Sequence, residues 1–168
     1  MKASFNNEKE YYNFWSKVIK KERECEIKYF KNLIKNVPLK KREKEGFSIS
    51  NLKAKKIPNS LKLIYRFGRN KEIDTEIKIG DTVIVYFQEL ENEKDKEKIF
   101  KQGIFGVLEN KGKKFLDISF NRKLPKSFLK RKLVVSLFIS EITFKRMIKS
   151  LEKIKEGETV FDFDLILT

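Results

Sequence analysis

The sequence predicts an α+β fold in which a small closed antiparallel β-barrel of about six strands is carried on a stalk of two helices. Three observations indicate this architecture. A long segment with helical periodicity opens the chain, short strands separated by turn signals fill its middle, and a second helical segment follows them. Short strands at this spacing, with glycines at positions 103 and 106 that allow bending, favour a closed barrel over an open sheet.

The first stalk helix is expected over residues 7–36, which contain neither proline nor glycine. Apolar residues recur at helical spacing from Tyr11 to Leu33, whereas residues 20–24 are charged on every side. A helix of about 30 residues spans about 45 Å. A polar middle between two apolar ends favours a stalk that is attached at each end over an ordinary amphipathic core helix. A short helix is then expected over residues 39–45.

The barrel is expected to follow as residues 47–139. Its predicted strands cover residues 47–52, 61–67, 82–87, 99–108, 115–120 and 133–139. Residues 89–98 are charged and lack aromatic and β-branched residues, so we expect an exposed loop there. Glycines 103 and 106 fall inside a predicted strand and suggest a bulge or a sharp bend.

The stalk is expected to extend over residues 1–46 and to be completed by residues 140–168. Ser140 can cap a returning helix that Gly157 ends, and this helix can pack antiparallel to the first one. The tail, residues 160–167, is rich in apolar residues. Since an isolated apolar end is a liability, we expect the tail to lead into a further domain.

Composition excludes several kinds of chemistry. The 168 residues contain no histidine and one cysteine, Cys25, which excludes a Ser-His-Asp triad, a Cys-His nucleophile, a Cys/His zinc site and an internal disulfide. Residues 1–8 lack the apolar core of a signal peptide. The longest apolar run, residues 133–139, is far shorter than the about 20 residues of a membrane helix. We therefore expect a cytoplasmic protein with no membrane partner.

The charge of the chain indicates a polyanionic partner. Lysine and arginine number 39 against 24 acidic residues, giving a net charge of +15. Residues 108–132 hold nine basic and two acidic residues, whereas residues 156–168 hold four acidic residues and no basic one. A solubilising lysine-rich surface is the alternative, but it does not require such polarisation along the chain. Nucleic acid is the usual partner of this pattern, with an anionic membrane surface or an acidic protein as rivals.

Five segments taken in order resemble a known family. They are the charged helical run 22–26, the basic run 40–46, the strand entry 79–83, the Gly-Val pair 106–107 before a basic hairpin, and the run 143–151 on the closing helix. With this order and spacing the sequence resembles the N-terminal region of the up-frameshift class of superfamily 1 helicases, which includes the immunoglobulin-mu-binding helicases.

The resemblance implies an accessory β-barrel, called the 1B domain, raised on two stalk helices from the first motor domain. In that family the barrel and stalk help to hold single-stranded nucleic acid over the motor, and the motor domains follow directly with a phosphate-binding loop. ATP and magnesium are therefore expected in motor domains of a longer parent chain. We expect this chain to be the front part of such a protein, acting as a monomer.

Residues 106–114 superficially resemble a phosphate-binding loop. They have five residues between the two glycines instead of four, and Lys114 where a serine or threonine should hold magnesium. We interpret this segment as a basic hairpin. No catalytic residue, cofactor site or metal site is therefore expected in this chain, and binding is its expected activity.

Single-stranded DNA or RNA is the expected partner, together with the motor domains of the parent chain. The candidate contact residues are Arg69 and Lys71, Lys111, Lys113 and Lys114 on a later hairpin, and Arg122, Lys123, Lys126, Lys130, Arg131 and Lys132 around Pro125. Phe120 and Phe128 lie nearby, and we expect core positions for them rather than stacking platforms. A free-standing single-strand-binding protein and a protein–protein adaptor of a helicase stay open as alternatives.

Overall fold

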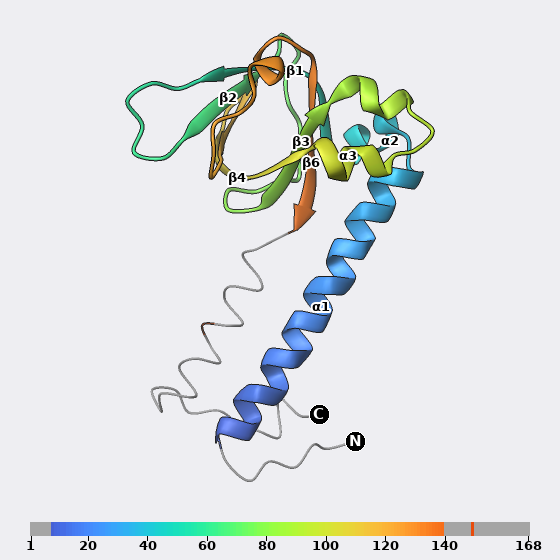
Figure 1. The fold of residues 1–168 in the computed structure, drawn as a ribbon, viewed down its shortest axis with the longest axis vertical. Helices are drawn as coiled ribbons and strands as arrows, with labels where there is room; N and C mark the ends of the chain where they lie inside the picture. The colour runs from blue at the N-terminus through green and yellow to red at the C-terminus, as the bar shows by residue number, and fades with distance from the viewer. Residues whose placement is uncertain (1–7, 140–148, 150–168) are drawn as a thin grey trace. The chain divides into compact units, whose positions relative to one another are not determined.

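The computed structural model describes residues 8–139 and Lys149 (Figure 1). By contacts the chain divides into two compact units, one of Met1–Glu26 with Glu141–Thr168 and one of Ile27–Ser140. The predicted returning helix and tail lie outside the described residues, apart from Lys149, so the two-helix stalk stays a prediction. No helix in the described part of the chain is long and apolar enough to cross a membrane.

The described elements follow one another in chain order. They are α1 (Glu8–Asn36), α2 (Leu39–Lys44), β1 (Ser48–Lys56), β2 (Ile64–Gly68), β3 (Thr82–Phe87), the 3₁₀-helix η1 (Gln88–Asn92), α3 (Glu97–Gln102), β4 (Ile104–Lys111), β5 (Phe115–Ser119), the 3₁₀-helix η2 (Lys126–Leu129) and β6 (Leu133–Ile139).

The strands close into an antiparallel barrel in the order β1-β2-β5-β4-β3-β6, which confirms the predicted α+β fold class (Figure 1). The long connection between β3 and β4 carries η1 and α3. In Figure 1 these two helices and α2 gather at one side of the barrel, beside the C-terminal end of α1. The candidate site begins where this helical side meets β1 and continues to the loop between β2 and β3 and the hairpin between β4 and β5.

The barrel is held by two apolar clusters. The inner cluster fills the barrel with alternate side chains of the strands, including the fully buried Leu52, Phe67 and Leu108. A second cluster on the outer face of β3 and β6 joins Tyr86 and Val134 to side chains from α1, η1 and α3. Because both faces of β3 and β6 are covered, these two strands read as continuous apolar runs in the sequence.

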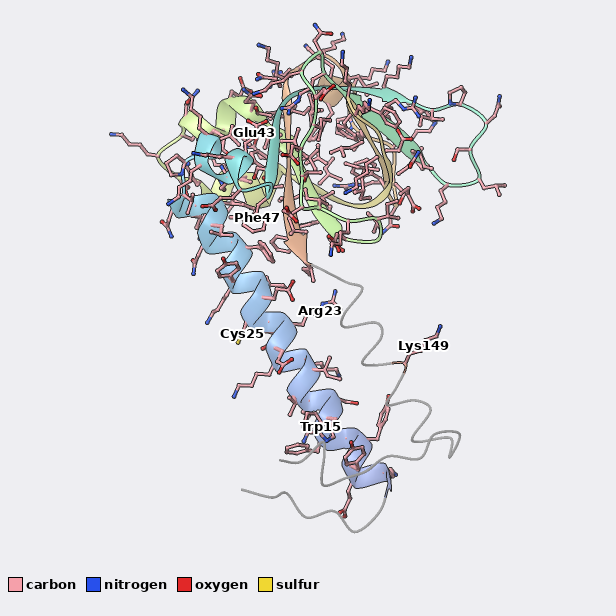
Figure 2. The ribbon with its side chains drawn as sticks, turned by 180° about the vertical axis from the view of Figure 1, so that it is seen from behind. Trp15, Arg23, Cys25, Glu43, Phe47 and Lys149 are labelled. Carbon is pink, nitrogen blue, oxygen red and sulfur yellow. The ribbon has the colours of Figure 1, made fainter. Side chains whose placement is uncertain are left out.

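The helix α1 begins and ends where the periodicity predicts. In the unit Ile27–Ser140, Phe30 packs edge-on against Phe47 with ring centroids 6.1 Å apart, which anchors this end of the helix to the barrel. In the charged middle, residues 20–22 and 24 are exposed and Arg23 is half-buried, and the neighbouring Cys25, labelled in Figure 2, is exposed. In the other unit Tyr11 is buried, with its ring 6.4 Å from that of Trp15.

The connection between β3 and β4 differs from the prediction. Residues 89–98 are an exposed loop only in part: residues 92–95 are exposed, but the segment also contributes most of η1 and the start of α3, and Leu90 is buried. The predicted strand 99–108 is wrong in its first half, where α3 runs to Gln102 and buries Ile99. The strand β4 begins only at Ile104.

The two glycines of this region are not a bulge. Gly103 follows α3, and a Cβ there would lie 2.5 Å from the carbonyl oxygen of Ile99. Gly106 pairs in regular register with Val83, while the irregularity of β4 falls two residues later, between Leu108 and Asn110. Both glycines therefore serve close packing rather than bending.

Candidate nucleic-acid interface

Seven of the eleven candidate residues line three hollows that adjoin in a row on the unit Ile27–Ser140. We name them the Phe87 hollow, the Glu43 hollow and the Lys111 hollow. Gln88 lines both of the first two, and Asp74 lines both of the last two, so each hollow borders the next. The sequence order of the candidates does not reveal this arrangement, because closure of the barrel brings distant loops together.

The Phe87 hollow has a volume of about 440 Å³ and is the most basic of the three. Its lining residues are Lys53, Phe87, Gln88, Glu89, Asn92, Lys130, Arg131 and Lys132. Four of them are basic and one is acidic. Two hydrogen bonds to backbone carbonyl oxygens shape it: Gln88 N donates to Lys132 O at 3.0 Å, and the side-chain Nζ of Lys53 donates to Lys130 O at 3.1 Å. A positive hollow on a barrel surface suits a phosphate backbone.

Aromatic rings lie beneath the cations of this hollow. The ring of Phe87 is half-buried, and its centroid is 4.5 Å from that of the buried Phe128. The guanidinium carbon of Arg131 lies over the Phe87 ring, 4.8 Å from its centroid. Arg131 also donates to Glu89 at 2.8 Å. The hollow thus combines positive charge with a stacked guanidinium.

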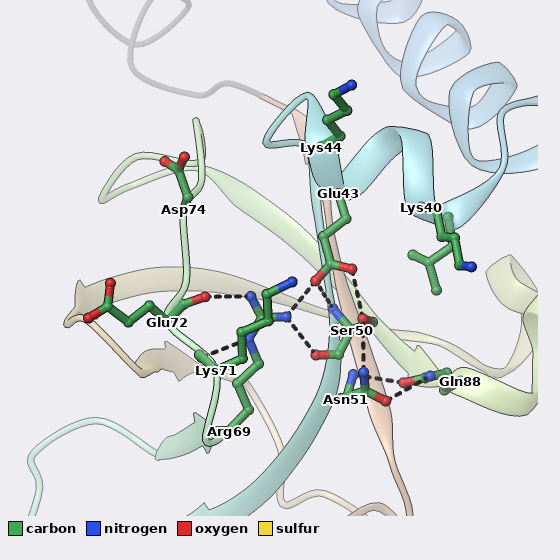
Figure 3. Close-up of a pocket in the computed structure, with 11 residues that line it drawn as sticks. Lys40, Glu43, Lys44, Ser50, Asn51, Arg69, Lys71, Glu72, Asp74 and Gln88 are labelled. Carbon is green, nitrogen blue, oxygen red and sulfur yellow. Dashed lines mark hydrogen bonds and ion pairs between the residues drawn. The ribbon is translucent and has the colours of Figure 1, made fainter.

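The Glu43 hollow has a volume of about 590 Å³ and is lined in part by Arg69. The guanidinium of Arg69 bonds to groups of the chain itself. Figure 3 shows Glu43 and Arg69 facing one another, and the side chain of Arg69 is only 7% exposed. Arg69 donates to the Glu43 carboxylate and to the carbonyl oxygens of Ser50, Lys71 and Glu72. Its guanidinium therefore holds the loop after β2, whereas the Lys71 side chain is exposed.

The carboxylate of Glu43 completes this arrangement. It accepts hydrogen bonds from Ser50 N at 3.1 Å and from Ser50 Oγ at 2.8 Å. Burial alone would raise the pKa of Glu43, but the bonds from Arg69 and Ser50 outweigh it and hold that pKa below its ordinary value. Lys40 and Lys44, from α2, also line this hollow and are exposed.

Asn51 and Gln88 are hydrogen-bonded to each other where the Phe87 hollow borders the Glu43 hollow. Asn51 N donates to Gln88 Oε1 at 2.7 Å, and Gln88 Nε2 donates to Asn51 Oδ1 at 3.1 Å (Figure 3). Asn51 has a positive φ of 59°, which asparagine tolerates better than most residues, and it lies at the irregularity of β1. The amide pair therefore fixes the start of η1 to the bulge of β1.

The Lys111 hollow, of about 460 Å³, lies between the hairpin that joins β4 to β5 and the loop that joins β2 to β3. Lys111 and Lys113 line it, and Lys111 Nζ donates to Ile77 O at 2.9 Å. The basic hairpin is thus tied to the neighbouring loop. The remaining candidates are exposed but line none of these three hollows: Lys114, Arg122, Lys123 and Lys126.

The structure adds residues that the sequence analysis missed. Lys53 was missed because the predicted first strand ends at position 52, although apolar and polar residues keep alternating to Ala54. Lys40 and Lys44 belong to a helix that was expected to serve the stalk. The core positions predicted for Phe120 and Phe128 are confirmed, since both are buried.

A buried charge cluster holds α2 and η1 beside these hollows. Arg42, which is 1% exposed, donates to both carboxylate oxygens of Glu91 at 2.5 and 2.7 Å. Tyr86 OH donates to the same carboxylate at 2.5 Å, and burial raises the pKa of Tyr86, so its hydroxyl stays protonated. Arg42 donates further to Val37 O, Ser48 Oγ, Ser136 Oγ and Tyr86 OH.

The described residues offer no group of three or more His, Cys, Asp or Glu side chains that could hold a metal ion. Fold and site together define a closed β-barrel domain with a row of surface hollows, one of them strongly basic.

Comparison with known proteins relates this domain to a helicase. No family model matches the chain. An uncharacterized ATP-dependent helicase of Methanocaldococcus jannaschii is 38% identical to it over 137 residues, which cover 81% of this chain and 19% of that protein. The chain thus spans about a fifth of the length of this relative, and the match supports a helicase-associated domain.

Proposed function

We propose that the chain is the accessory nucleic-acid-binding domain of an ATP-dependent helicase of the up-frameshift and immunoglobulin-mu-binding class of superfamily 1, called superfamily 1B. Its barrel grips single-stranded DNA or RNA over the motor domains, which bind ATP and magnesium elsewhere in the parent chain. The similarity to a helicase and the closed barrel support this proposal. The observation that carries it is the Phe87 hollow, which gathers four cations and one carboxylate around an aromatic floor.

The physical basis is phosphate neutralisation. Lys53, Lys130 and Lys132 come from two segments that lie far apart in sequence, and the barrel brings them to one concave surface. Each cation that meets a phosphate releases condensed counterions, so affinity falls steeply as salt rises. The Glu43 hollow continues the surface, but its three acidic residues oppose its four basic ones. The Phe87 hollow is therefore the centre of the proposed interface.

Fluorescence anisotropy with a labelled single-stranded oligonucleotide tests the proposal. For three or four phosphate contacts we expect the association constant to fall about 20- to 50-fold between about 50 and 200 mM salt. A triple variant, Lys53→Glu, Lys130→Glu and Lys132→Glu, should weaken binding by about 20-fold or more at low salt. Its matched control reverses three exposed lysines of α1: Lys17, Lys20 and Lys21.

The two triple variants change the net charge equally, so their comparison separates a local interface from a general charge effect. Equal losses of affinity would show that the Phe87 hollow is not the interface. Absence of binding by the unmodified chain at low salt would refute the proposal and favour a protein–protein adaptor of a helicase.

A further inference from the structure

The cations of the Phe87 hollow are not equivalent. Arg131 lies over the ring of Phe87, and that ring in turn packs at a tilt of 44° against the buried ring of Phe128. The successive separations are 4.5 Å between ring centroids and 4.8 Å from the ring to the guanidinium carbon. A guanidinium on an aromatic ring is held flat by cation–π attraction and keeps its donors at its edge.

The outer face of this guanidinium is open to a ligand. The side chain of Arg131 is 54% exposed even though one of its faces lies on Phe87. Glu89 accepts a hydrogen bond from Nη1 at 2.8 Å. Guanidinium N–H bonds lie in the plane of the group, so Glu89 occupies an edge of Arg131. It therefore leaves the outer face uncovered.

We propose that Arg131 is a base-stacking residue: one base of a bound single strand lies on the outer face of its guanidinium, on the side away from Phe87. Lys53, Lys130 and Lys132 then contact the phosphates on either side of this nucleotide. This inference rests on the proposed function, which it deepens by assigning a base contact to a surface otherwise described by its charge. Arginine planes stack on any base, so this contact is tolerant of sequence.

The test compares two oligonucleotides of the same length and charge, one with bases throughout and one with abasic positions at its centre. The unmodified chain should bind the first about five- to tenfold more tightly, because one stacking contact is lost in the second. Arg131→Lys keeps the positive charge and removes the planar group. We expect it to abolish this preference while the dependence of affinity on salt stays the same.

Arg66→Lys is the matched control. Arg66 also lies over a phenylalanine, 4.0 Å from the centroid of Phe115, and pairs with the Asp117 carboxylate, but it lines none of the three hollows. The Arg66→Lys variant should keep the preference for bases. A second variant, Phe87→Leu, removes the ring beneath Arg131 and should lose the preference as Arg131→Lys does.

Each outcome decides the inference. Equal affinity of the unmodified chain for both oligonucleotides would overturn base stacking while the proposed function stands. Retention of the preference by both Arg131→Lys and Phe87→Leu would place the stacking elsewhere and overturn the assignment to Arg131. Absence of binding to either oligonucleotide at low salt would refute the proposed function itself, and the inference with it.

Discussion

The burial of Arg42 makes it the residue whose loss should cost most. Substitution to alanine leaves the Glu91 carboxylate, whose side chain is 8% exposed, without its bidentate partner. Breaking a buried ion pair by removing one partner costs about 3–5 kcal/mol, because a buried charge is left uncompensated. We expect Arg42→Ala to lower the free energy of unfolding by this amount in urea denaturation followed by circular dichroism.

Lys96→Ala is the control for this prediction. Lys96 Nζ lies 3.4 Å from the same carboxylate but is more exposed than Arg42, so its removal should cost less than about 1 kcal/mol. Arg42→Ala and Lys96→Ala variants that unfold at the same urea concentration would contradict the central role given to Arg42.

Glu43 should make the stability of the barrel sensitive to acid. Its pKa is lowered from 4.5, because hydrogen bonds from Arg69 and Ser50 outweigh the effect of burial. A carboxylate with a lowered pKa in the folded state contributes stability above pH 4.5 and loses it as the pH falls through the folded-state value. We therefore expect Glu43→Gln to be less stable than the unmodified chain at pH 7.

The measurement is the free energy of unfolding of both proteins from pH 7 to pH 3. The difference between them should shrink once the pH falls below 4.5, where protonation removes the same charge from the unmodified chain. A difference that stays constant over this range would show that the charge of Glu43 contributes nothing.

Arg69 shows why the site was harder to predict than the fold. The sequence reveals its charge and its place after a strand, and these are the properties of a phosphate contact. They are equally the properties of a guanidinium that satisfies three carbonyl oxygens and a carboxylate, as Arg69 does. Partners such as Glu43 and Ser50 lie at least 19 residues away, and only the closed barrel places them beside it.

At the level of elements, the pairing of β4 with β5 depends on a glycine. A Cβ at Gly106 would lie 2.6 Å from Ile118 Cγ2 and 2.8 Å from both Phe120 Cε1 and Ser119 O. Gly106→Ala should therefore destabilise the barrel by about 1–3 kcal/mol through overpacking. The denaturant midpoint of the purified variant measures this loss.

Gly68, at the end of β2, is the matched control for Gly106. A Cβ there would meet Lys114 O at 3.5 Å, an ordinary contact distance, so Gly68→Ala should change the free energy of unfolding by less than about 0.5 kcal/mol. If Gly68→Ala proves as destabilising as Gly106→Ala, the close packing seen at Gly106 is not the cause.

At the level of elements, the sequence predicts best the strands that are buried on both faces. The strands β3 and β6 have the bounds predicted for them, because both of their faces are covered and their sequences are apolar apart from Thr82 and Ser136. The helix α3 was missed because Ile99 and Phe100 follow a charged run and resemble the start of a strand. The helix α3 is buried by the second apolar cluster, which also contains side chains of α1 and β3. This cluster forms only when residues far apart in sequence come together in the fold.

At the scale of the whole molecule, net charge is a poor guide to the interface. The excess of 15 positive charges is uneven along the chain, yet a local cluster of cations need not carry a net charge: the Glu43 hollow nearly neutralises its own cations with Glu43, Glu72 and Asp74. What distinguishes the Phe87 hollow is that its four cations are opposed by a single carboxylate, that of Glu89. Binding should therefore depend on closure of the barrel more than on total charge.

A fragment of residues 27–140 tests this dependence on the intact barrel. Every residue of the two apolar clusters and of the three hollows lies within this range, so the fragment contains the core and the proposed interface together. We expect it to unfold in one cooperative transition and to bind the single-stranded oligonucleotide within about threefold of the full chain. Thermal denaturation and anisotropy measure the two properties. A fragment that folds cooperatively but binds much more weakly would place part of the interface in the unit Met1–Glu26 with Glu141–Thr168.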